Sequence, residues 1–276
     1  MLADMHVHTT YSDGQYTPAE IIALAKAAGV KVISKTDHDT VGGTDEAAAA
    51  AEETGIHFIS GVEISCKGSP DVHILGYGID HNEPNLVKAC SAFVEYRNIR
   101  NQQIIDYLRS KRVQITPDDV YAVETNANVV GRPHFARIML NKGYVTTIQE
   151  AFAKYLATPE YMKAVHRKKP EAGKGIQYIT QAGGLPCLAH PGYIKLPDAE
   201  IDALVGELAH NGLRCIECWY STHTGEQTQF FLRLAKKYNI IPTGGTDFHG
   251  PVYKPDINLG TVSFYMTVEQ VGLFQK

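Results

Sequence analysis

The sequence predicts an α/β fold with mostly parallel strands, and two observations favour a β/α barrel. Short apolar runs alternate with helical patterns over residues 1–84 and 173–276, which is the rhythm of βα units. Between these parts, residues 85–172 carry helical apolar spacing with no convincing strand. We therefore expect a barrel with an inserted helical subdomain at 85–172, and an open doubly wound sheet is the alternative.

The N-terminal part alternates strands and helices in a regular order. Thr17 and Pro18 provide an N-cap and a first-turn proline for a helix that Gly29 closes, and Gly55 closes the next helix. The predicted elements are a strand at 2–8, a helix at 18–29, a strand at 30–36, a helix at 44–55, a strand at 56–65 and a shorter β stretch at 71–79.

The remaining elements follow from the same patterns. Within the insertion, the helical segments are 88–112, 116–123, 131–143 and 148–157. The βα rhythm then resumes with helices at 175–184, 198–212 and 225–239, and with strands at 185–190, 213–220, 240–250 and 259–264.

Composition narrows the class of protein. The chain has 276 residues, of which 44% are hydrophobic and 20% charged, so it can bury a sizeable core. A net charge of -4 provides no basic field for holding long nucleic acid, so we expect any nucleotide to be bound locally. No signal peptide or membrane-spanning run is evident, so we expect a cytoplasmic protein without membrane association, of unknown oligomeric state.

The five cysteines do not form a disulfide framework. Cys215 and Cys218 have the C-x-x-C spacing of zinc and redox sites, but they lie in the apolar run RCIECWY. On a strand, residues three apart point to opposite faces, so we interpret both as ordinary core residues.

Metal-binding side chains gather at predicted strand ends. His6 and His8 lie two apart on the first strand and therefore share a face, and Asp247 and His249 repeat this spacing after a later strand. Titratable groups directly after a buried strand need partners, which metal ions can provide. The full candidate set is His6, His8, Asp13, His38, Glu63, His73, His190, Asp247 and His249. Nine mixed nitrogen and oxygen ligands exceed the needs of one tetrahedral zinc, so more than one ion is expected.

Six segments in order resemble a known family. HVHTTYSDG, TDHDT, GVEIS, the isolated His73, AHPG and GGTDFHG are similar to the motifs of the polymerase and histidinol phosphatase (PHP) domain family of metal-dependent phosphoesterases. The resemblance covers residues 1–80 and 175–250. It implies a distorted seven-stranded β/α barrel with two or three divalent ions, commonly manganese, iron or zinc.

The resemblance also implies how the ligands are shared. By this analogy one ion is held by His6, His8, Glu63 and Asp247, and a second by Asp13, His38 and His249. Glu63 bridges to a third ion, held with His73 and His190. Lys35 departs from the family pattern, in which an apolar or small residue is expected before TDHD, and its role is open.

The insertion favours relatives that act on nucleotides. Stand-alone PHP proteins resembling nucleoside bisphosphate phosphatases and short-oligoribonucleotide exonucleases carry such an insertion. Here it contains Gly131-Arg132-Pro133-His134, where Arg132, His134 and a helix N-terminus could bind a phosphate or form an ordinary helix start. Further candidates for substrate contact are Tyr11, Ser12 and Tyr193, for which packing is the alternative.

We therefore expect hydrolysis of a nucleotide phosphate ester by a metal-activated hydroxide, with no catalytic residue separate from the metal ligands. The substrate would be a nucleoside 3′,5′-bisphosphate or a short oligoribonucleotide. Glu217 could support a ligand or be a structural carboxylate. Three alternatives stay open: a histidinol-phosphate-type phosphatase, an amidohydrolase-type metal hydrolase and a non-catalytic metal-stabilised binding module.

Overall fold

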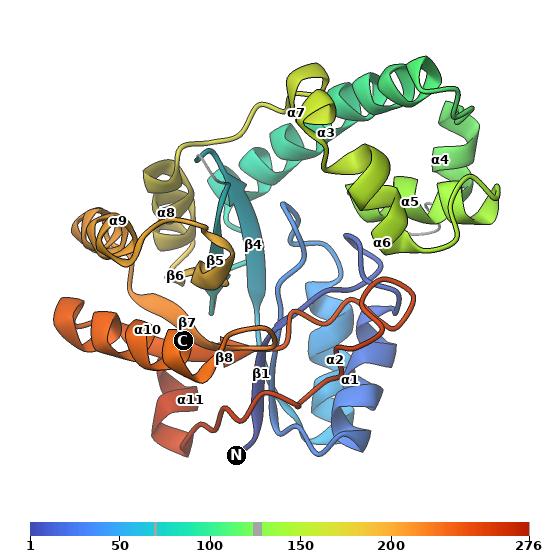
Figure 1. The fold of residues 1–276 in the computed structure, drawn as a ribbon. Coiled ribbons are helices and arrows are strands. Elements are labelled where there is room, and N and C mark those ends of the chain that lie inside the picture. Colours follow the sequence, from blue (N-terminus) through green and yellow to red (C-terminus); the bar gives the residue numbers. More distant parts are fainter. Residues whose placement is uncertain (69–70, 124–128, 276) are drawn as a thin grey trace.

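The computed structural model describes residues 1–68, 71–123 and 129–275, which form an α/β fold with two sheets (Figure 1). The first sheet is parallel, in the order β1–β2–β3, and the second has the order β4–β5–β6–β7–β8. The strands are β1 Ala3–Val7, β2 Val32–Lys35, β3 His57–Ile59, β4 Gly61–Cys66, β5 Val72–Tyr77, β6 Leu185–Leu188, β7 Cys215–Tyr220 and β8 Ile241–Gly245.

Helices connect the strands and form most of the middle of the chain. They are α1 Pro18–Ala27, α2 Thr44–Thr54, α3 Pro84–Ser110, α4 Pro117–Val123, α5 Arg132–Asn141, α6 Ile148–Ala151, α7 Pro159–Ala164, α8 Ala172–Gln181, α9 Asp198–His210, α10 Gly225–Tyr238 and α11 Val268–Phe274. A π-helical turn, Phe152–Leu156, continues α6, and a 3₁₀ turn, Pro191–Tyr193, follows β6. Among the described helices, none combines the length and the apolar character needed to span a membrane.

Local sequence signals explain where the helices begin and end. Thr17 and Glu20 form a reciprocal capping box at the start of α1, which satisfies two backbone N–H groups that have no partner within the helix. Gly55 ends α2 in the left-handed conformation, which costs glycine little. These predicted helices are confirmed.

The two sheets approach each other without closing into a single barrel. Isolated parallel bridges join Val7 to Phe248 and His38 to Glu63, next to the sheet edges. The α/β class is confirmed, but strand pairing in the described residues gives sheets of three and five strands rather than one closed ring of seven. The C-terminal ends of β1 and β2 in the first sheet lie near β4 and β8 of the second sheet (Figure 1).

Two strand predictions were wrong. The run 56–65 divides at Ser60 into β3 and β4, which belong to different sheets, and the Ser60 hydroxyl donates to the carbonyl of Ile79 at 2.6 Å. The run 259–264 forms no strand, because Gly260 adopts a left-handed φ of 70° and its N–H donates to Asp4. The pairs β4–β5 and β5–β6 are antiparallel, whereas the other four are parallel as expected.

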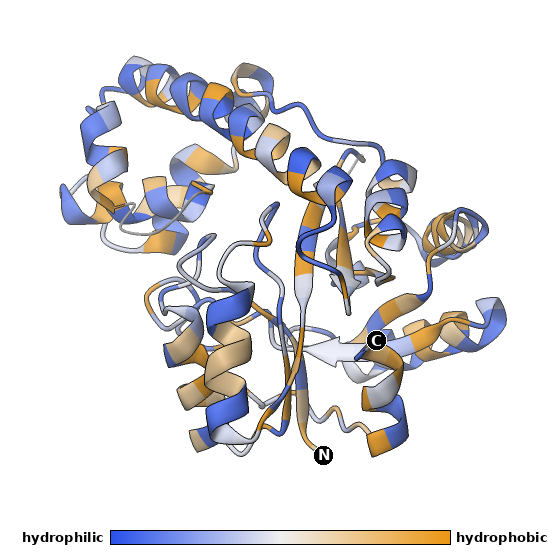
Figure 2. Cartoon of the chain, turned by 180° about the vertical axis from the view of Figure 1, so that it is seen from behind, coloured by the Kyte–Doolittle hydropathy of each residue, from blue (hydrophilic) through white to orange (hydrophobic). Residues whose placement is uncertain are grey.

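The core is divided between the sheets and the helical region. Apolar residues lie along the central strands, as the hydropathy colouring shows (Figure 2). Helix α3 belongs to both parts: Leu86 and Phe93 pack in a cluster with β4, β5 and α8, whereas Ile104 and Leu108 pack in a separate cluster with α5 and α6. The 27 residues of α3 thus connect the helical region rigidly to the larger sheet.

Candidate metal centre

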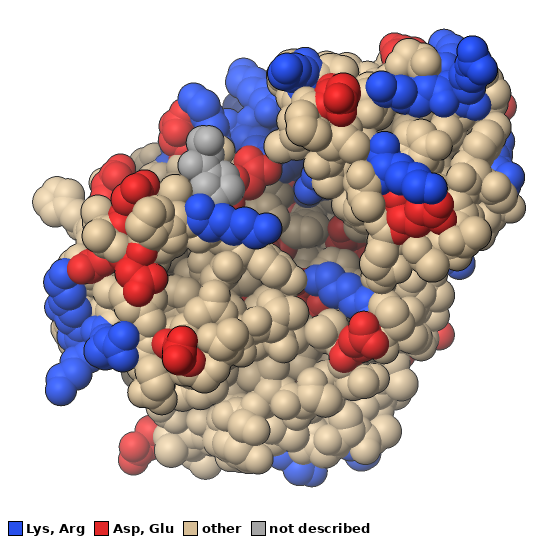
Figure 3. Space-filling model, viewed as in Figure 1, with Lys and Arg blue, Asp and Glu red and all other residues tan. Residues whose placement is uncertain are grey.

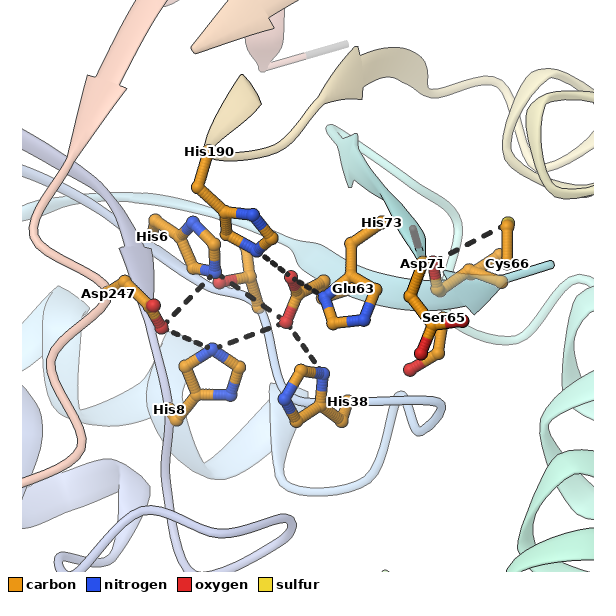
Figure 4. A network of polar contacts seen from close by, with 12 residues as sticks. His6, His8, His38, Glu63, Ser65, Cys66, Asp71, His73, His190 and Asp247 are labelled. Carbon is orange, nitrogen blue, oxygen red and sulfur yellow. Dashed lines mark hydrogen bonds and ion pairs between the residues drawn. The ribbon is translucent and has the colours of Figure 1, made fainter. Parts of the chain in front are cut away.

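All nine predicted ligands lie close together where the two sheets meet. Figure 4 shows His6, His8, His38, Glu63, His73, His190 and Asp247 facing one another. They come from distant segments: β1 and the loop after it, the end of β2, β4, β5, the end of β6 and the loop after β8. We call His6, His8, Asp13, His38, Glu63, His73, His190, Asp247 and His249 the ligand cluster. The fold therefore brings together every residue that the strand-end pattern had selected.

Glu63 lies at the centre of the ligand cluster. Its side chain is fully buried on β4, and its Oε1 lies 2.8 Å from His73 Nδ1 and 3.0 Å from His190 Nε2. Its Oε2 lies 2.6 Å from His38 Nδ1 and 3.4 Å from His8 Nε2. A carboxylate facing ring nitrogens on both oxygens can bridge two metal ions.

Asp247 contributes a second carboxylate with one oxygen free for the cluster. Its Oδ2 accepts a hydrogen bond from the Tyr220 hydroxyl at 2.6 Å and from Lys254 Nζ at 2.5 Å. Its Oδ1 lies 3.1 Å from His8 Nε2 and 3.2 Å from His249 Nδ1. Asp247 has a left-handed backbone with φ of 55°, a strained conformation of the kind found at functional sites.

Asp13 connects the cluster to the helical region. Its Oδ1 lies 3.3 Å from His249 Nε2 and 3.7 Å from His8 Nδ1. At the start of α5, a Cβ on Gly131 would come within 2.9 Å of Asp13 Oδ2, so only glycine allows this close approach. Without a side chain at Gly131, α5 can pack directly against the ligand cluster.

Burial and mutual charge shift the pKa values of the cluster. Burial lowers the pKa of His8 to about 3 and that of His73 to about 4. Burial would also lower the pKa of His6, but the carboxylates of Glu217, Asp247 and Glu63 raise it well above its usual value. Burial opposes ionisation of Glu63, yet the surrounding histidines hold its pKa well below the usual range.

The cluster fits metal ions because its buried polar atoms lack hydrogen bonds. Five such atoms make no hydrogen bond within the described structure: His6 Nε2, His8 Nε2, Asp13 Oδ1, His38 Nδ1 and Glu63 Oε2. Buried polar atoms without partners are costly, and ring nitrogens and carboxylate oxygens are ligands for divalent ions. The cluster is therefore suited to bind metal.

Four subsets of the cluster have ligand atoms within 4.8 Å of one another. They are His8, Asp13, His38 and His249; His6, His190 and Asp247; His6, His8 and Glu63; and His38, Glu63 and His73. The first subset contains the three residues expected to bind the second ion, Asp13, His38 and His249, together with His8. His190, in contrast, groups with His6 and Asp247, although its Nε2 also contacts Glu63.

Glu217 orients two members of the ligand cluster. It is fully buried on β7, and its Oε1 accepts from His6 Nδ1 at 3.1 Å while its Oε2 accepts from the backbone N–H of His190 at 2.6 Å. When the His6 ring is neutral, a proton on Nδ1 leaves Nε2 unprotonated toward the cluster. Glu217 therefore supports the cluster without belonging to it.

A cavity of 720 Å³ opens over the ligand cluster. Figure 3 shows this hollow between the helical region and the sheets, with basic side chains around it. We call its lysines and arginines the basic wall: Lys67, Arg97, Arg100, Arg132, Arg167, Lys168, Lys169 and Lys254. The chain is acidic overall, so this wall is a local concentration of positive charge.

Asp39 fixes part of the basic wall. It is buried at the end of β2 with φ of 56°, and its Oδ2 accepts from Arg97 Nε at 2.8 Å and from Arg167 Nη1 at 2.7 Å. Although burial opposes ionisation, the two arginines hold the pKa of Asp39 far below its usual value. Asp39 thus anchors α3 and the segment after α7 beside the cluster.

The predicted substrate contacts divide into two groups. Arg132 and Tyr193 line the cavity, and Tyr193 is 49% exposed. Tyr11, Ser12 and His134 do not line it.

For these three residues the structure gives a packing or hydrogen-bonding role instead of the expected contact. The Tyr11 ring packs against Gly42 and Gly43. The buried Ser12 hydroxyl donates to Asp37, and His134 Nδ1 accepts from the Gly131 N–H and caps α5. These groups are occupied by the fold, so the geometry does not favour them as substrate contacts.

The sequence analysis missed several residues that hold Asp247 and Asp39 in place. Lys254 and Tyr220 hold Asp247, and Arg97 and Arg167 hold Asp39. Arginines within a helical pattern look like surface residues, because only their distant partner explains their burial. The one usable signal was Asp39 itself, an acidic residue directly after a buried strand.

Lys35, Cys215 and Cys218 are also placed by the structure. Lys35, whose role the sequence left open, is 2% exposed, and its Nζ lies 2.8 Å from Asp37 Oδ2. Cys215 and Cys218 are buried in different apolar clusters, as expected for opposite faces of a strand. Burial raises the pKa of both thiols, which is consistent with ordinary core residues.

Comparisons with known proteins agree with this site. The PHP domain model matches residues 4–160. A 3′,5′-nucleoside bisphosphate phosphatase of Chromobacterium violaceum is 34% identical over 249 residues, covering 90% of this chain and 87% of that protein. A 5′-3′ exoribonuclease of Haemophilus influenzae is 32% identical over 254 residues, covering 90% of each.

A solved structure agrees in fold. A Bifidobacterium adolescentis protein described as a metal-dependent phosphoesterase aligns with a TM-score of 0.87 and 30% identity, covering 99% of this chain and 94% of that one. The family model, the relatives and the ligand cluster all support one conclusion. The chain belongs to the PHP domain family.

Proposed function

We propose that this protein is a metal-dependent phosphoesterase that hydrolyses a phosphate ester of a nucleotide. The substrates would be a nucleoside 3′,5′-bisphosphate or the end of a short oligoribonucleotide, as the names of its relatives suggest. The observation that carries the proposal is a largely buried set of nine residues with nitrogen and oxygen ligand atoms, below a cavity with a basic wall. Metal ligands alone would suit many hydrolases, but the adjacent cations favour an anionic substrate.

The nine residues would hold two or three divalent ions, with manganese, iron and zinc as candidates. His6, His8, Glu63 and Asp247 would bind one ion, and Asp13, His38 and His249 a second. Glu63 would share a third with His73 and His190. Bound ions would supply Lewis-acid polarisation of the phosphate and activation of water.

The protein's own residues bind and orient the substrate. A cavity of 720 Å³ falls within the range of roughly 300–1,000 Å³ typical of small-molecule sites. Arg132 offers a guanidinium fork at the N-terminus of α5, a geometry that suits a phosphate group. Tyr193, half-exposed beside His190, offers a ring face for a base.

The division of the chain follows from this site. We propose that residues 1–84 and 173–276 form one metal-binding unit, a distorted barrel of the family type, and that residues 85–172 form an inserted helical subdomain. Residues 1–84 and 173–276 contain all nine candidate ligands, whereas the insertion supplies most of the basic wall. The insertion would therefore select the substrate.

One assay tests the proposed function. The purified protein is stripped with a chelator, reloaded separately with Mn²⁺, Fe²⁺ or Zn²⁺, and tested on a nucleoside 3′,5′-bisphosphate, a short RNA, histidinol phosphate and a cyclic amide. We expect phosphate release or nucleotide release that disappears on stripping and returns with metal.

Each other outcome identifies a different protein. Turnover of histidinol phosphate alone or of the cyclic amide alone would replace the proposed substrate class. Metal binding without turnover of any of the four would indicate a binding module. Full activity after complete stripping would overturn the metal-dependent proposal.

A further inference from the structure

A buried lysine lies behind the ligand cluster, outside the basic wall. Lys35 ends β2 with 2% of its surface exposed, and its Nζ lies 2.8 Å from Asp37 Oδ2. A buried ammonium is costly unless a carboxylate compensates it. Neither residue lines the cavity, so this pair acts on something other than the substrate directly.

Asp37 accepts hydrogen bonds with both oxygens. Its Oδ1 accepts from the Thr9 N–H at 2.8 Å and from the Ser12 hydroxyl at 2.5 Å, and its Oδ2 accepts from the Thr9 hydroxyl at 2.6 Å. Lys35 adds a positive charge beside Oδ2. Surrounded by donors only, Asp37 is an ionised acceptor.

The direction of these bonds determines the proton position on His8. The Ser12 hydroxyl has one proton, and it donates that proton to Asp37. Its Oγ also lies 3.3 Å from His8 Nδ1, where it can therefore only accept. This contact is a hydrogen bond only when His8 Nδ1 carries the proton, and that tautomer leaves Nε2 with a free lone pair.

The lone pair on His8 Nε2 faces the ligand cluster. His8 Nε2 lies 3.1 Å from Asp247 Oδ1 and 3.4 Å from Glu63 Oε2, inside the ligand cluster. We propose that Lys35, Asp37 and Ser12 form a positioning relay that fixes His8 in its Nδ1–H tautomer and presents an unprotonated Nε2 to the cluster. The consequence for metal binding rests on the proposed function, whereas the tautomer does not.

A competing tautomer makes the relay necessary. With its proton on Nε2, the His8 ring would donate to Asp247 Oδ1 at 3.1 Å and would be unable to bind an ion there. The other neighbour of Nδ1, Asp13 Oδ1, lies 3.7 Å away and is too distant for a hydrogen bond. Ser12 is therefore the group that decides between the two tautomers.

The relay is tested in metal-free protein by long-range ¹H–¹⁵N NMR of histidine-labelled samples, with His8 assigned by comparison with His8→Gln. We expect the Nδ1–H pattern for His8 in the wild type and a shift to the Nε2–H pattern in Ser12→Ala. The matched control is Ser34→Ala, because Ser34 is an equally buried serine on β2 whose hydroxyl makes no hydrogen bond in the described structure. It should leave the His8 pattern unchanged.

A second readout measures Mn²⁺ affinity by EPR of the free ion. We expect a loss of about 10- to 100-fold in Ser12→Ala, the usual effect of removing a group that orients a ligand. Lys35→Met, which removes the charge but keeps the length of the side chain, should weaken affinity in the same direction, and Ser34→Ala should retain it. Thermal unfolding of the metal-free variants checks that each one folds.

The outcomes separate the relay from the metal proposal. An Nε2–H tautomer of His8 in the wild type, or an unchanged Nδ1–H tautomer in Ser12→Ala, would overturn the relay. Wild-type affinity in Lys35→Met would remove Lys35 from it. If the wild-type protein shows the Nδ1–H tautomer but binds no metal, the proposed function is wrong and the relay still holds.

Discussion

The ligand cluster and the basic wall face the same cavity, but the fold holds their side chains in different ways. In the cluster, Glu217 and Ser12 contact the second ring nitrogens of His6 and His8, and both partners are themselves buried. In the wall, the Arg132 guanidinium lies over the Phe152 ring and donates a long hydrogen bond of 3.4 Å to the carbonyl of Leu156. The cluster is rigidly preorganised. Within the wall, Asp39 fixes Arg97 and Arg167, whereas Arg132 is held more weakly and can adjust.

This difference suggests a division of labour. Metal ligands must be held within narrow limits of distance and angle, which buried partners such as Glu217 and Ser12 can provide. Cations that meet a charged substrate gain from flexibility, because they keep contact with water until the substrate arrives. Changes in the cluster should therefore affect turnover, and changes in the wall should affect substrate affinity.

The largest expected effect comes from His8→Ala. It removes a buried ligand that faces both Glu63 and Asp247, and turnover should fall by more than about 100-fold, since removing even a supporting group costs about 10- to 100-fold. Steady-state kinetics with saturating metal measures it. His210→Ala, at the exposed end of α9, is the control. Unchanged turnover in His8→Ala would refute the site.

Glu217→Gln should have the next largest effect. The carboxylate accepts from His6 with one oxygen and from the His190 N–H with the other, and an amide has only one accepting oxygen. We expect metal affinity to fall by about 10- to 100-fold. A metal titration measures this effect, and Glu207→Gln on the exposed side of α9 is the comparison. Equal affinities would mean that Glu217 is only structural.

Arg132→Ala should separate the wall from the cluster. We expect KM to rise about 10- to 100-fold with kcat nearly unchanged, because a charged hydrogen bond contributes about 1.5–3 kcal/mol. The control is Arg109→Ala, whose side chain is 55% exposed on α3. A fall in kcat at constant KM would instead place Arg132 in the chemistry.

The smallest expected effect concerns pH. Burial lowers the pKa of Lys169 to about 8, although Asp71 opposes the shift. The side chain of Lys169 is positively charged below that pH and loses its charge as the pH rises above it. KM for an anionic substrate should therefore rise about threefold between pH 7 and 9.

The variant Lys169→Met should remove this step in KM, and Lys163→Met on α7 should keep it. A profile of KM against pH with both variants measures the effect. A step that persists in Lys169→Met belongs to another group.

The ligand cluster was predictable because its residues lie at regular strand positions. His6 and His8 share a face by the two-residue period of a strand, and Glu63 interrupts an apolar run where a carboxylate needs compensation. Ser12 and Tyr11 were predicted less well, since proximity to Asp13 in the sequence does not determine which way a loop side chain points.

Other parts of the fold depended on contacts distant in sequence. The division of 56–65 into β3 and β4 follows from Ser60 bonding to Ile79, and the missing strand at 259–264 follows from Gly260 bonding to Asp4. Tertiary hydrogen bonds outweighed the apolar pattern in both places.

By itself the sequence determined the α/β class, the order of most elements and the nine candidate ligands, because backbone periodicity and the cost of burying charge are local properties. Only the tertiary structure decided which partner each ligand has. Lys35 shows the reason. Its neighbours in the sequence do not reveal its role, which appears only when Ser12 from another segment donates to Asp37 and contacts His8. Packing between distant segments determines which ring nitrogen of His8 carries the proton, and no local sequence pattern predicts this.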